Sequence, residues 1–410
     1  MTNINPLYLV KVEPGANNNK MYRMIPNGDY FEVQYGRIGN TGYQTKTYPI
    51  SKWDSQYKSK IKKGYVDNSR LVAETIITPN KKKEYLDINN PSIAQIVARL
   101  QSMARQAIKD NYTINSQNVT QAMITEAQLI LNNLIDTEDI EIFNKILVDL
   151  FKTIPRKMGK VKNYLAKENK DFSEIIQREQ DLLDVMKCQV VQHSIVKDEE
   201  NENNTYEMPN QTILEVLGLQ FEEITQEEKE LIKRNLGGIS DKYYQAWKVI
   251  NNKTQSRFDE FVKNNNINKT IMLFHGSKSE NFWSIINMGL VLRPPAVITG
   301  KLYGNGIYFA PKARKSLGYT SLNGSYWVRG NSDSGFMALF DVIYGKPYDV
   351  YTFDSKYHNL DYENLQKMCP ESNSLHAHAG ANIGYSTLKN DEIIVYKEEQ
   401  CTIKYLIELR

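Results

Sequence analysis

Three short stretches near the C-terminus decide the fold: Leu273-Phe274-His275-Gly276-Ser277, Gly304-Asn305-Gly306-Ile307-Tyr308-Phe309-Ala310 and Asp391-Glu392-Ile393-Ile394-Val395-Tyr396. Each stretch lies beside an apolar, β-prone run, so a rigid sheet can hold its polar group at a common cleft. The polar groups are the imidazole of His275, the phenol ring of Tyr308 and the carboxylate of Glu392. Together they indicate a site for a polar, ring-bearing ligand that reacts through a cationic centre.

These motifs resemble the catalytic domain of the poly(ADP-ribose) polymerase (PARP) family of NAD-dependent ADP-ribosyltransferases. The spacing supports the resemblance, because Tyr308-Phe309-Ala310 is followed by Lys315-Ser316 and then by Tyr319, which is the family's register. The resemblance covers nearly the whole chain and is most specific over residues 271–319 and 390–409. It implies that NAD⁺ is consumed as a substrate.

The resemblance also implies how NAD⁺ is held. His275 would hydrogen-bond a ribose hydroxyl, and the backbone of Gly276 would bind the nicotinamide carboxamide, because a residue without a side chain permits close approach. Tyr308 and Tyr319 would pack their rings against the nicotinamide. The implied NAD⁺-binding residues are His275, Gly276, Ser277, Asn281, Tyr308, Lys315, Ser316 and Tyr319.

Glu392 is the principal catalytic residue that the resemblance implies, with His275 and Tyr308 beside it. Cleavage of the nicotinamide–ribose bond develops oxocarbenium character, which a nearby carboxylate stabilises as it does in glycosidases. The same carboxylate can polarise the attacking acceptor. The positively charged nicotinamide is its own leaving group, so we expect no metal. A Glu at this place is the family pattern for chain elongation, although some members with the His-Tyr-Glu set transfer a single unit.

Two segments depart from the family pattern. Val291 stands where relatives often place an adenosine-contacting Arg, and whether Arg293, two residues on, substitutes for it stays open. Pro294–Gly300 resembles the loop that lines the donor site. The segment Ser372–Asp391 is shorter than the usual acceptor-side loop and contains His376-Ala377-His378. A His-x-His pair is able to bind metal, but without a Cys or a third His nearby we expect an ordinary loop surface.

Composition describes a protein of ordinary solubility with room for several cores. The chain has 410 residues, 41% hydrophobic and 24% charged, with a mean hydropathy of −0.53. This length predicts two to three domains. Three Cys without a CxxC pair fit a reducing compartment and argue against structural zinc. Without an apolar run of membrane-spanning length or a signal peptide, we expect an intracellular protein: nuclear in a eukaryote, in the nucleoid or cytoplasm for a bacterium or virus.

The N-terminal segment is basic, since residues 1–85 hold 14 Lys and Arg against 7 Asp and Glu. On charge alone, a polyanion partner and a lysine-rich solubilising surface are equally good explanations. Gln34-Tyr35-Gly36-Arg37-Ile38-Gly39 resembles the core of the Trp-Gly-Arg (WGR) domain of DNA-dependent PARPs. That resemblance implies phosphate contacts from basic residues and stacking by aromatic rings. The implied DNA-binding residues are Tyr35, Gly36, Arg37, Lys46 and Trp53, with Lys60, Lys62 and Lys63 as further charges.

The middle of the chain has the periodicity of a helical bundle. Apolar residues recur at i, i+3, i+4 and i+7 spacing over 93–108, over 143–154 until Pro155, and over 175–186. The acidic stretch Asp198–Asn204 lacks this periodicity, so we place a boundary there. By resemblance this block is the regulatory helical domain of PARPs; a static scaffold is the alternative.

We therefore predict a multidomain α+β chain. A small β-rich WGR DNA-binding domain occupies 1–85, and an all-α helical regulatory domain occupies 90–200. A mixed α/β ADP-ribosyltransferase catalytic domain with an antiparallel or mixed sheet core occupies 205–410.

The function implied by the resemblance is a DNA-break-activated, NAD-dependent protein ADP-ribosyltransferase, a poly(ADP-ribose) polymerase of the DNA damage response and repair. Its partners would be DNA strand breaks with 5′-phosphorylated ends and protein acceptors, including itself; no membrane is involved. Two alternatives stay open. One is mono-ADP-ribosylation of protein or of nucleic-acid ends. The other is a DNA-end-binding protein whose transferase domain is inactive or only hydrolyses NAD.

Overall fold

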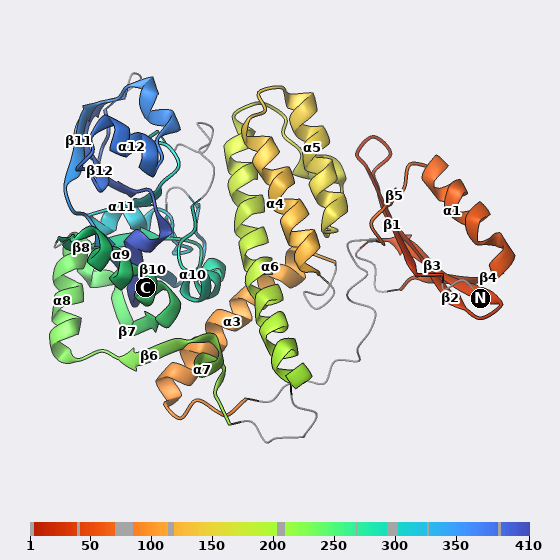
Figure 1. Ribbon diagram of the computed structural model, residues 1–410, viewed down its shortest axis with the longest axis horizontal. Helices are drawn as coiled ribbons and strands as arrows, with labels where there is room; N and C mark the ends of the chain where they lie inside the picture. Colours follow the sequence, from red (N-terminus) through yellow and green to blue (C-terminus); the bar gives the residue numbers. More distant parts are fainter. Residues whose placement is uncertain are drawn as a thin grey trace. The chain divides into compact units, whose positions relative to one another are not determined.

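A computed structural model describes residues 4–38, 42–69, 85–113, 119–202, 210–267, 269–292, 302–325, 328–383 and 387–410, with the backbone alone for 193–202 (Figure 1). The chain forms two compact units. Unit 1 consists of Met1–Lys83 and Arg105–Asn204, and unit 2 consists of Glu84–Ala104 and Thr205–Arg410. The predicted boundary between 200 and 205 therefore falls close to a division between units. Near residue 85 the chain also passes from one unit to the other, but residues 1–83 and 105–204 belong to the same unit.

Unit 1 begins with a β-rich module. Its five-stranded antiparallel sheet has the order β4-β3-β2-β1-β5. The elements are β1 Leu7–Glu13, β2 Asn18–Asn27, β3 Tyr30–Arg37, β4 Gln44–Pro49, α1 Trp53–Lys62 and β5 Val66–Asp67. A tight turn joins β2 to β3 at Gly28, whose φ of 59° favours glycine. The ring of Trp53 closes the core edge-on against Phe31, 5.0 Å between centroids, so α1 covers one face of the sheet.

The helical part of unit 1 confirms the periodicity in the sequence. Its main helices are α4 Gln121–Ile135, α5 Ile140–Thr153 and α6 Asp171–Glu202, joined by the last residues of α3 Pro91–Asn111. Thr120 and Asp139 cap α4 and α5 by accepting bonds from the first backbone amides. The prediction for Asp198–Asn204 is wrong in part, because α6 continues to Glu202. Acidic and amide side chains are compatible with a helix that neighbours have already nucleated, which local composition does not reveal.

Within unit 1, hydrogen bonds tie the β-rich module to the segment that follows α5. The buried amide of Asn19 donates to the Arg156 carbonyl at 3.0 Å. The backbone amide of Val161 donates to the Asn17 side-chain oxygen, also at 3.0 Å. Arg156 lies in the short connection between α5 and η4 Val161–Tyr164, and Val161 begins η4. The module and the bundle therefore share a polar junction.

Unit 2 contains two sheets. A five-stranded antiparallel sheet has the order β6-β7-β14-β10-β8, and a four-stranded mixed sheet has the order β11-β12-β13-β9, in which only β11 and β12 run parallel. The strands are β6 Leu219–Glu223, β7 Tyr243–Asn251, β8 Thr270–Gly276, β9 Ile307–Phe309, β10 Gly335–Ile343, β11 Pro347–Thr352, β12 Ser374–Asn382, β13 Glu392–Val395 and β14 Cys401–Leu409. This arrangement confirms the mixed α/β character expected for 205–410.

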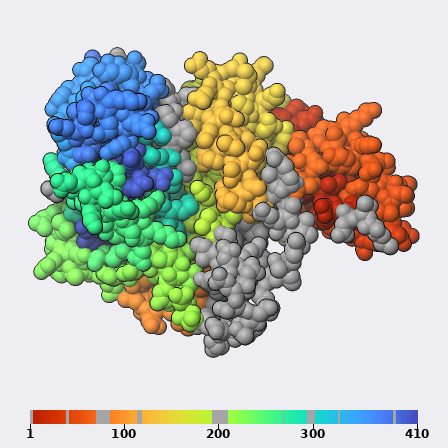
Figure 2. All heavy atoms as spheres, viewed as in Figure 1, coloured from red at the N-terminus to blue at the C-terminus, as the bar shows by residue number. Residues whose placement is uncertain are grey.

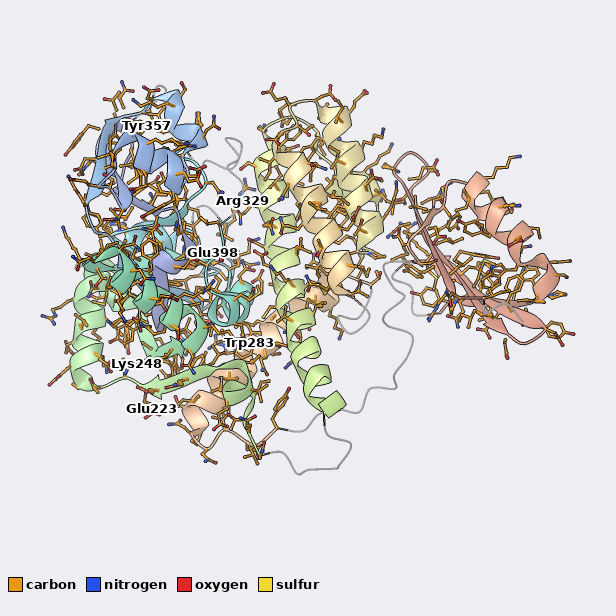
Figure 3. The ribbon with its side chains drawn as sticks, in the orientation of Figure 1. Glu223, Lys248, Trp283, Arg329, Tyr357 and Glu398 are labelled. Carbon is orange, nitrogen blue, oxygen red and sulfur yellow. The ribbon has the colours of Figure 1, made fainter. Side chains whose placement is uncertain are left out.

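Helices and two apolar cores support these sheets. The helices of this part are α7 Ile213–Leu217, α8 Gln226–Leu236, α9 Asn252–Asn265, α10 Phe282–Met288, α11 Ala313–Leu317 and α12 Tyr362–Met368. The five-stranded sheet is buried along β10 and β14, its central strands. The core of the four-stranded sheet includes Tyr303, Leu375 and Tyr357, which is labelled in Figure 3. Trp283 of α10, also labelled there, is fully buried.

The first turns of α3 belong to unit 2, although the sequence assigned them to the helical domain. The Ser92 hydroxyl accepts a bond from the indole of Trp247 at 3.2 Å. The Arg99 guanidinium pairs with the Glu408 carboxylate at 2.8 Å, and that carboxylate is 2% exposed. Periodicity identifies a helix but does not identify the body against which it packs, which explains the difference.

His376-Ala377-His378 lies inside β12 and not in a loop, so that expectation is wrong; the alternation of polar and small residues there has the period of a strand. Among the helices that the structure describes, none is both long enough and apolar enough to cross a membrane.

A buried ion pair in the helical part of unit 1 yields a stability prediction. Arg156 and Glu179 form an ion pair at 2.9 Å, with side chains 2% and 1% exposed. We expect Glu179→Gln to destabilise unit 1 by about 3–5 kcal/mol, because it leaves the guanidinium charge buried without compensation. Hydrogen exchange of the backbone amides of α5 and α6 measures this loss.

The matched control is Asp149→Asn, which removes the exposed pair of Asp149 with Lys152 at 2.8 Å. This change is expected to cost less than about 1 kcal/mol. Equal protection of the α6 amides in both variants would contradict the importance assigned to the buried pair.

Candidate active site

His275 is the second-last residue of β8, the edge strand of the five-stranded sheet. It lies in β8 opposite Ala338 of β10, and its Nδ1 is 3.3 Å from the carbonyl oxygen of Tyr308. The rings of Phe309 and Phe340 stand edge-on to the imidazole at 6.1 and 6.2 Å. The imidazole is therefore fixed by strand pairing on one side and by the Tyr308 backbone on the other.

The glycine-rich loop positions the ring of Tyr308. Gly304 has a φ of 80°, and a Cβ on it would come within 2.2 Å of the Leu360 carbonyl oxygen, so only glycine fits. The Tyr308 hydroxyl donates to the Gly304 carbonyl at 3.1 Å and accepts from the Tyr303 amide at 3.0 Å. Burial raises the pKa of Tyr308 well above its usual value, and the Glu392 carboxylate adds to the shift. The hydroxyl is thus engaged by its own loop, which makes the ring face the part that meets a ligand.

Gly276 and Ser316 are in direct contact. A Cβ on Gly276 would lie 2.0 Å from the carbonyl oxygen of Ser316, which belongs to α11. The Ser316 hydroxyl donates to the Phe274 carbonyl at 3.2 Å. The close approach of strand to helix thus depends on the absence of a side chain at Gly276.

Glu392 is the first residue of β13 and forms an ion pair with Lys315 of α11. The two side chains are 17% and 16% exposed, so the pair is largely withdrawn from water without being sealed. Burial, and next to it the Glu392 charge, raises the pKa of Tyr319 to about 12. The carboxylate therefore acts electrostatically on both Tyr308 and Tyr319, which places its negative charge beside two aromatic rings.

The remaining predicted NAD⁺ contacts are also near β8. The Asn281 amide donates to the Ser277 hydroxyl at 3.0 Å, so the two residues form one polar pair. Arg293 and the loop Pro294–Gly300 lie outside the described residues. The sequence-predicted set is thus brought together as a group: His275 with Tyr308, Gly276 with Ser316, Ser277 with Asn281, and Glu392 with Lys315.

This arrangement has a definite chemical capacity. The carboxylate of Glu392 offers a negative charge next to flat aromatic surfaces, which suits a ligand that develops positive charge in its reaction. Lys315 orients that carboxylate by a charge-assisted bond. His275 and the Ser277–Asn281 pair supply hydrogen-bonding groups along β8 and the turn after it.

The N-terminal residues predicted to bind DNA fall into two groups. Trp53 is 8% exposed and lies in the core, so its ring has no open face on which a base can stack. The Arg37 guanidinium donates to the Asn17 carbonyl at 2.8 Å and to the carbonyl of Gly159, so it forms part of the junction within unit 1. Gly36 packs against Tyr43. By contrast, Lys46 is exposed, 5.9 Å from the centre of the Tyr35 ring.

Around these residues the structure gathers a basic patch that the sequence showed only in part. Its members, which we call the lysine–tyrosine patch, are Lys20, Lys46, Lys60 and Lys63 with the rings of Tyr22, Tyr35 and Tyr65. Burial and then the charges of Lys63, Lys20 and Lys46 lower the pKa of Lys60. Sequence reasoning missed Lys20. Its pairing with Arg37 across the β2–β3 hairpin was the signal that could have found it.

Comparison with known proteins agrees with the geometry. The family model for the poly(ADP-ribose) polymerase catalytic domain matches residues 220–410, which include all the active-site residues described above. An uncharacterized protein, 101L, of Invertebrate iridescent virus 6 is 31% identical over 178 residues, 42% of this chain and 73% of that protein.

Two named polymerases are also similar. Poly(ADP-ribose) polymerase 2 of Homo sapiens is 28% identical over 164 residues, which cover 35% of this chain and 27% of that protein. Poly(ADP-ribose) polymerase 2-B of Oryza sativa subsp. japonica is 22% identical over 365 residues, 81% of this chain and 57% of that protein. The second similarity therefore reaches well beyond the catalytic match into the N-terminal half.

The contact between Gly276 and Ser316 gives a test of the site. We expect Gly276→Ala to abolish the rise in melting temperature that NAD⁺ produces, because the added methyl group cannot coexist with the Ser316 carbonyl at 2.0 Å. Overpacking of this kind costs about 1–3 kcal/mol or more, so the unliganded protein also melts earlier. Thermal unfolding with and without NAD⁺ measures both effects.

Gly238→Ala is the matched control, because a Cβ there meets nothing within 4 Å. It is expected to leave the NAD⁺-dependent shift intact. If NAD⁺ raised the melting temperature of Gly276→Ala as much as that of the parent, the close packing of Gly276 on Ser316 would not be required for NAD⁺ binding, and the prediction would be wrong.

Proposed function

This chain belongs to the poly(ADP-ribose) polymerase family and is an NAD⁺ ADP-ribosyltransferase, and on that premise we propose that it is a polymerase activated by DNA breaks that modifies protein acceptors, including itself. One observation carries the proposal for the chemistry: the Glu392 carboxylate is paired with Lys315 beside the rings of Tyr308 and Tyr319. The family match over 220–410 includes all four residues. We propose an intracellular site of action, in keeping with its partners.

The proposed reaction follows from the roles of these side chains. Nicotinamide packs against Tyr308 and Tyr319, and His275 holds a ribose hydroxyl. The bond between the ribose C1′ and the nicotinamide nitrogen breaks, and its electron pair leaves with neutral nicotinamide. The Glu392 carboxylate stabilises the oxocarbenium-like centre and accepts a hydrogen bond from the 2′-hydroxyl. An acceptor oxygen then attacks C1′ and loses its proton to solvent through Glu392.

Lys315 is proposed as a positioning residue. Its ammonium bonds one oxygen of the Glu392 carboxylate and leaves the other for the ligand. A carboxylate held in this way loses less freedom when the transition state forms, which is the benefit of preorganisation. Because α11 also carries Ser316, one short helix sets both the carboxylate and the surface that meets Gly276.

DNA recognition is proposed to rest on the lysine–tyrosine patch. Three lysines whose charges lower the pKa of Lys60 suit, together with it, a row of phosphates. The partly exposed rings of Tyr35 and Tyr65 suit an exposed base or sugar, whereas Tyr22 is buried beneath them. Tyr35 and Lys46 keep their predicted roles in DNA binding. Trp53 is assigned a structural role in place of its predicted contact with DNA. A solubilising surface does not require this interleaving of lysines and rings.

Activation is proposed to pass through the junction within unit 1. Gly36 lies opposite Met21 in the β2–β3 hairpin, and the neighbouring Arg37 bonds the carbonyl of Gly159 beyond α5. A ligand on the lysine–tyrosine patch therefore meets strands that are hydrogen-bonded to the helical part. Mono-ADP-ribosylation and a DNA-end-binding protein that only hydrolyses NAD remain the alternatives, and the next experiment separates them.

The first test is incubation with labelled NAD⁺, with and without a nicked duplex that carries a 5′-phosphate. We expect a DNA-dependent ladder of labelled protein, reduced about 100-fold or more by Glu392→Gln because the charge opposite the developing cation is lost. Glu371→Gln is the matched control, since that carboxylate is 74% exposed and pairs with Lys346 at the surface.

The pattern of label distinguishes the alternatives. A single discrete labelled band assigns mono-transfer, and label on the oligonucleotide assigns nucleic-acid modification. Nicotinamide release without labelled macromolecule assigns hydrolysis. Without nicotinamide release and with DNA binding intact, the chain is a binding module, and the catalytic proposal is wrong.

Salt dependence tests the DNA interface. Each phosphate contact lowers the slope of log K against log salt by about 0.9, so Lys46→Gln and Lys60→Gln are each expected to reduce the magnitude of the slope by about 1. Fluorescence anisotropy of a labelled nicked duplex across a salt series measures this. Lys145→Gln on α5, an exposed lysine of unit 1, is the control and leaves the slope unchanged. Equal slopes in all the variants would move the DNA site elsewhere.

A further inference from the structure

A second cluster of functional side chains lies on the outer face of the four-stranded sheet. Asp349 of β11 pairs with His376 of β12 in register, and His378 follows two residues later on the same face. The ligand atoms of these three residues all lie within 4.8 Å of one another. The segment that carries β11, α12 and β12 forms a surface region of unit 2, blue in Figure 2.

The distances in this cluster match a metal site. Around a tetrahedral Zn²⁺ with bonds of about 2.0–2.1 Å, neighbouring ligand atoms are separated by about 3.3 Å. Asp349 Oδ1 is 2.7 Å from His378 Nε2 and 3.9 Å from His376 Nδ1, values on either side of that separation. Small rotations of partly exposed side chains are therefore enough to bring all three atoms to one ion.

A second carboxylate prepares His376 for coordination. Asp391 Oδ2 lies 3.0 Å from His376 Nε2, and Asp391 Oδ1 accepts a bond from the Ala379 amide at 2.8 Å. With its proton on Nε2 toward Asp391, the imidazole directs the Nδ1 lone pair toward Asp349. Metal-binding imidazoles are characteristically held by a carboxylate in this way.

Aromatic packing holds the second imidazole. The rings of His376 and His378 stack at 3.8 Å, and Tyr351 stacks on His378 at 4.3 Å with an angle of 6° between planes. The Tyr344 hydroxyl is 2.9 Å from His376 Nδ1, and a metal at that nitrogen displaces it. The stacking holds the two imidazoles next to each other, so that the small rotations described above bring their nitrogen atoms to one ion.

We propose that Asp349, His376 and His378 bind a divalent transition metal, Zn²⁺ in the first instance, through two imidazoles and one carboxylate with a fourth position open to water. The sequence argued against metal because it offered neither a Cys nor a third His nearby; the third ligand is a carboxylate from the neighbouring parallel strand. Two imidazoles and one carboxylate are a recognised donor set for Zn²⁺.

The proposed ion has a mechanical consequence for the transferase site. It links β11 to β12, and β12 pairs with β13 through only a few residues, among them Ala377 opposite Glu392. The side chain of Glu392 lies on the face of β13 opposite the one that meets Asp391 and His376. The metal therefore stabilises the strand next to Glu392 without touching the reaction.

The test measures metal directly. The full chain, stripped with chelator and dialysed against micromolar free Zn²⁺, is expected to retain one equivalent of zinc, measured by mass spectrometry. When Co²⁺ replaces zinc, we expect the d–d absorption bands of a tetrahedral or five-coordinate ion. The protein is also expected to melt at a higher temperature with zinc than without it. His376→Ala, His378→Ala and Asp349→Asn are each expected to remove the Co²⁺ bands. Asp391→Asn is expected to weaken Zn²⁺ affinity by about 10- to 100-fold.

Two variants guard against a misleading result. His358→Ala is the matched control. His358 lies in η8 Ser355–Asn359, outside the cluster, and its imidazole packs on Phe353. This variant should retain one equivalent of zinc. Tyr344→Phe removes the competing hydroxyl and should bind zinc at least as tightly as the parent. The proposal is overturned if the unaltered protein retains no zinc, or if the His376→Ala, His378→Ala double variant retains as much as the parent.

Discussion

A reciprocal pair of backbone hydrogen bonds joins the two sheets of unit 2 and sets the geometry of the candidate active site. The Phe274 amide donates to the Ala310 carbonyl at 3.0 Å, and the Ala310 amide donates back to Phe274 at 3.1 Å. The residue after Phe274 is His275, and Ala310 ends the stretch that carries Tyr308. The bridge therefore fixes the distance between an imidazole on one sheet and an aromatic ring on the other, while β9 transmits that position to Glu392 through its pairing with β13.

Close packing around this bridge leaves little tolerance. The Ser316 hydroxyl donates a hydrogen bond to the same Phe274 carbonyl oxygen. The carbonyl group of Ser316 itself occupies the space that a side chain at Gly276 would need. Gly304 is constrained in the same way by Leu360. The glycines of the motifs are thus explained by backbone contacts, and the polar residues by what those contacts bring together. An enzyme that stabilises a short-lived cation gains from such rigidity, because its carboxylate needs no reorganisation during the reaction.

Much of this could be read from the sequence, for identifiable reasons. Helical periodicity and β-prone runs indicate which elements form, and the spacing around Tyr308 indicates which residues share a site, because strands and short helices convert spacing into direction. What sequence could not supply is the partner of each side chain. Trp53 was expected at a surface and lies in the core, Arg37 was expected to meet phosphate and bonds backbone carbonyls, and α3 is divided between two units. Each of these depends on contacts between segments far apart in the chain, which local patterns do not encode.

The neighbours Asp391 and Glu392 illustrate how much depends on register. They are adjacent carboxylates, and one meets His376 on the outer face while the other meets Lys315 on the inner face. Because side chains alternate along a strand, a slip of one residue would exchange them and present the wrong carboxylate to the ligand. Pairing with β9 on one side and β12 on the other resists that slip, but both ladders are short. On the outer face, Asp391 accepts hydrogen bonds from His376 and from the Ala379 amide, and these contacts further restrain the register. The cluster of imidazoles and carboxylates on that face therefore favours the register in which Glu392 meets Lys315.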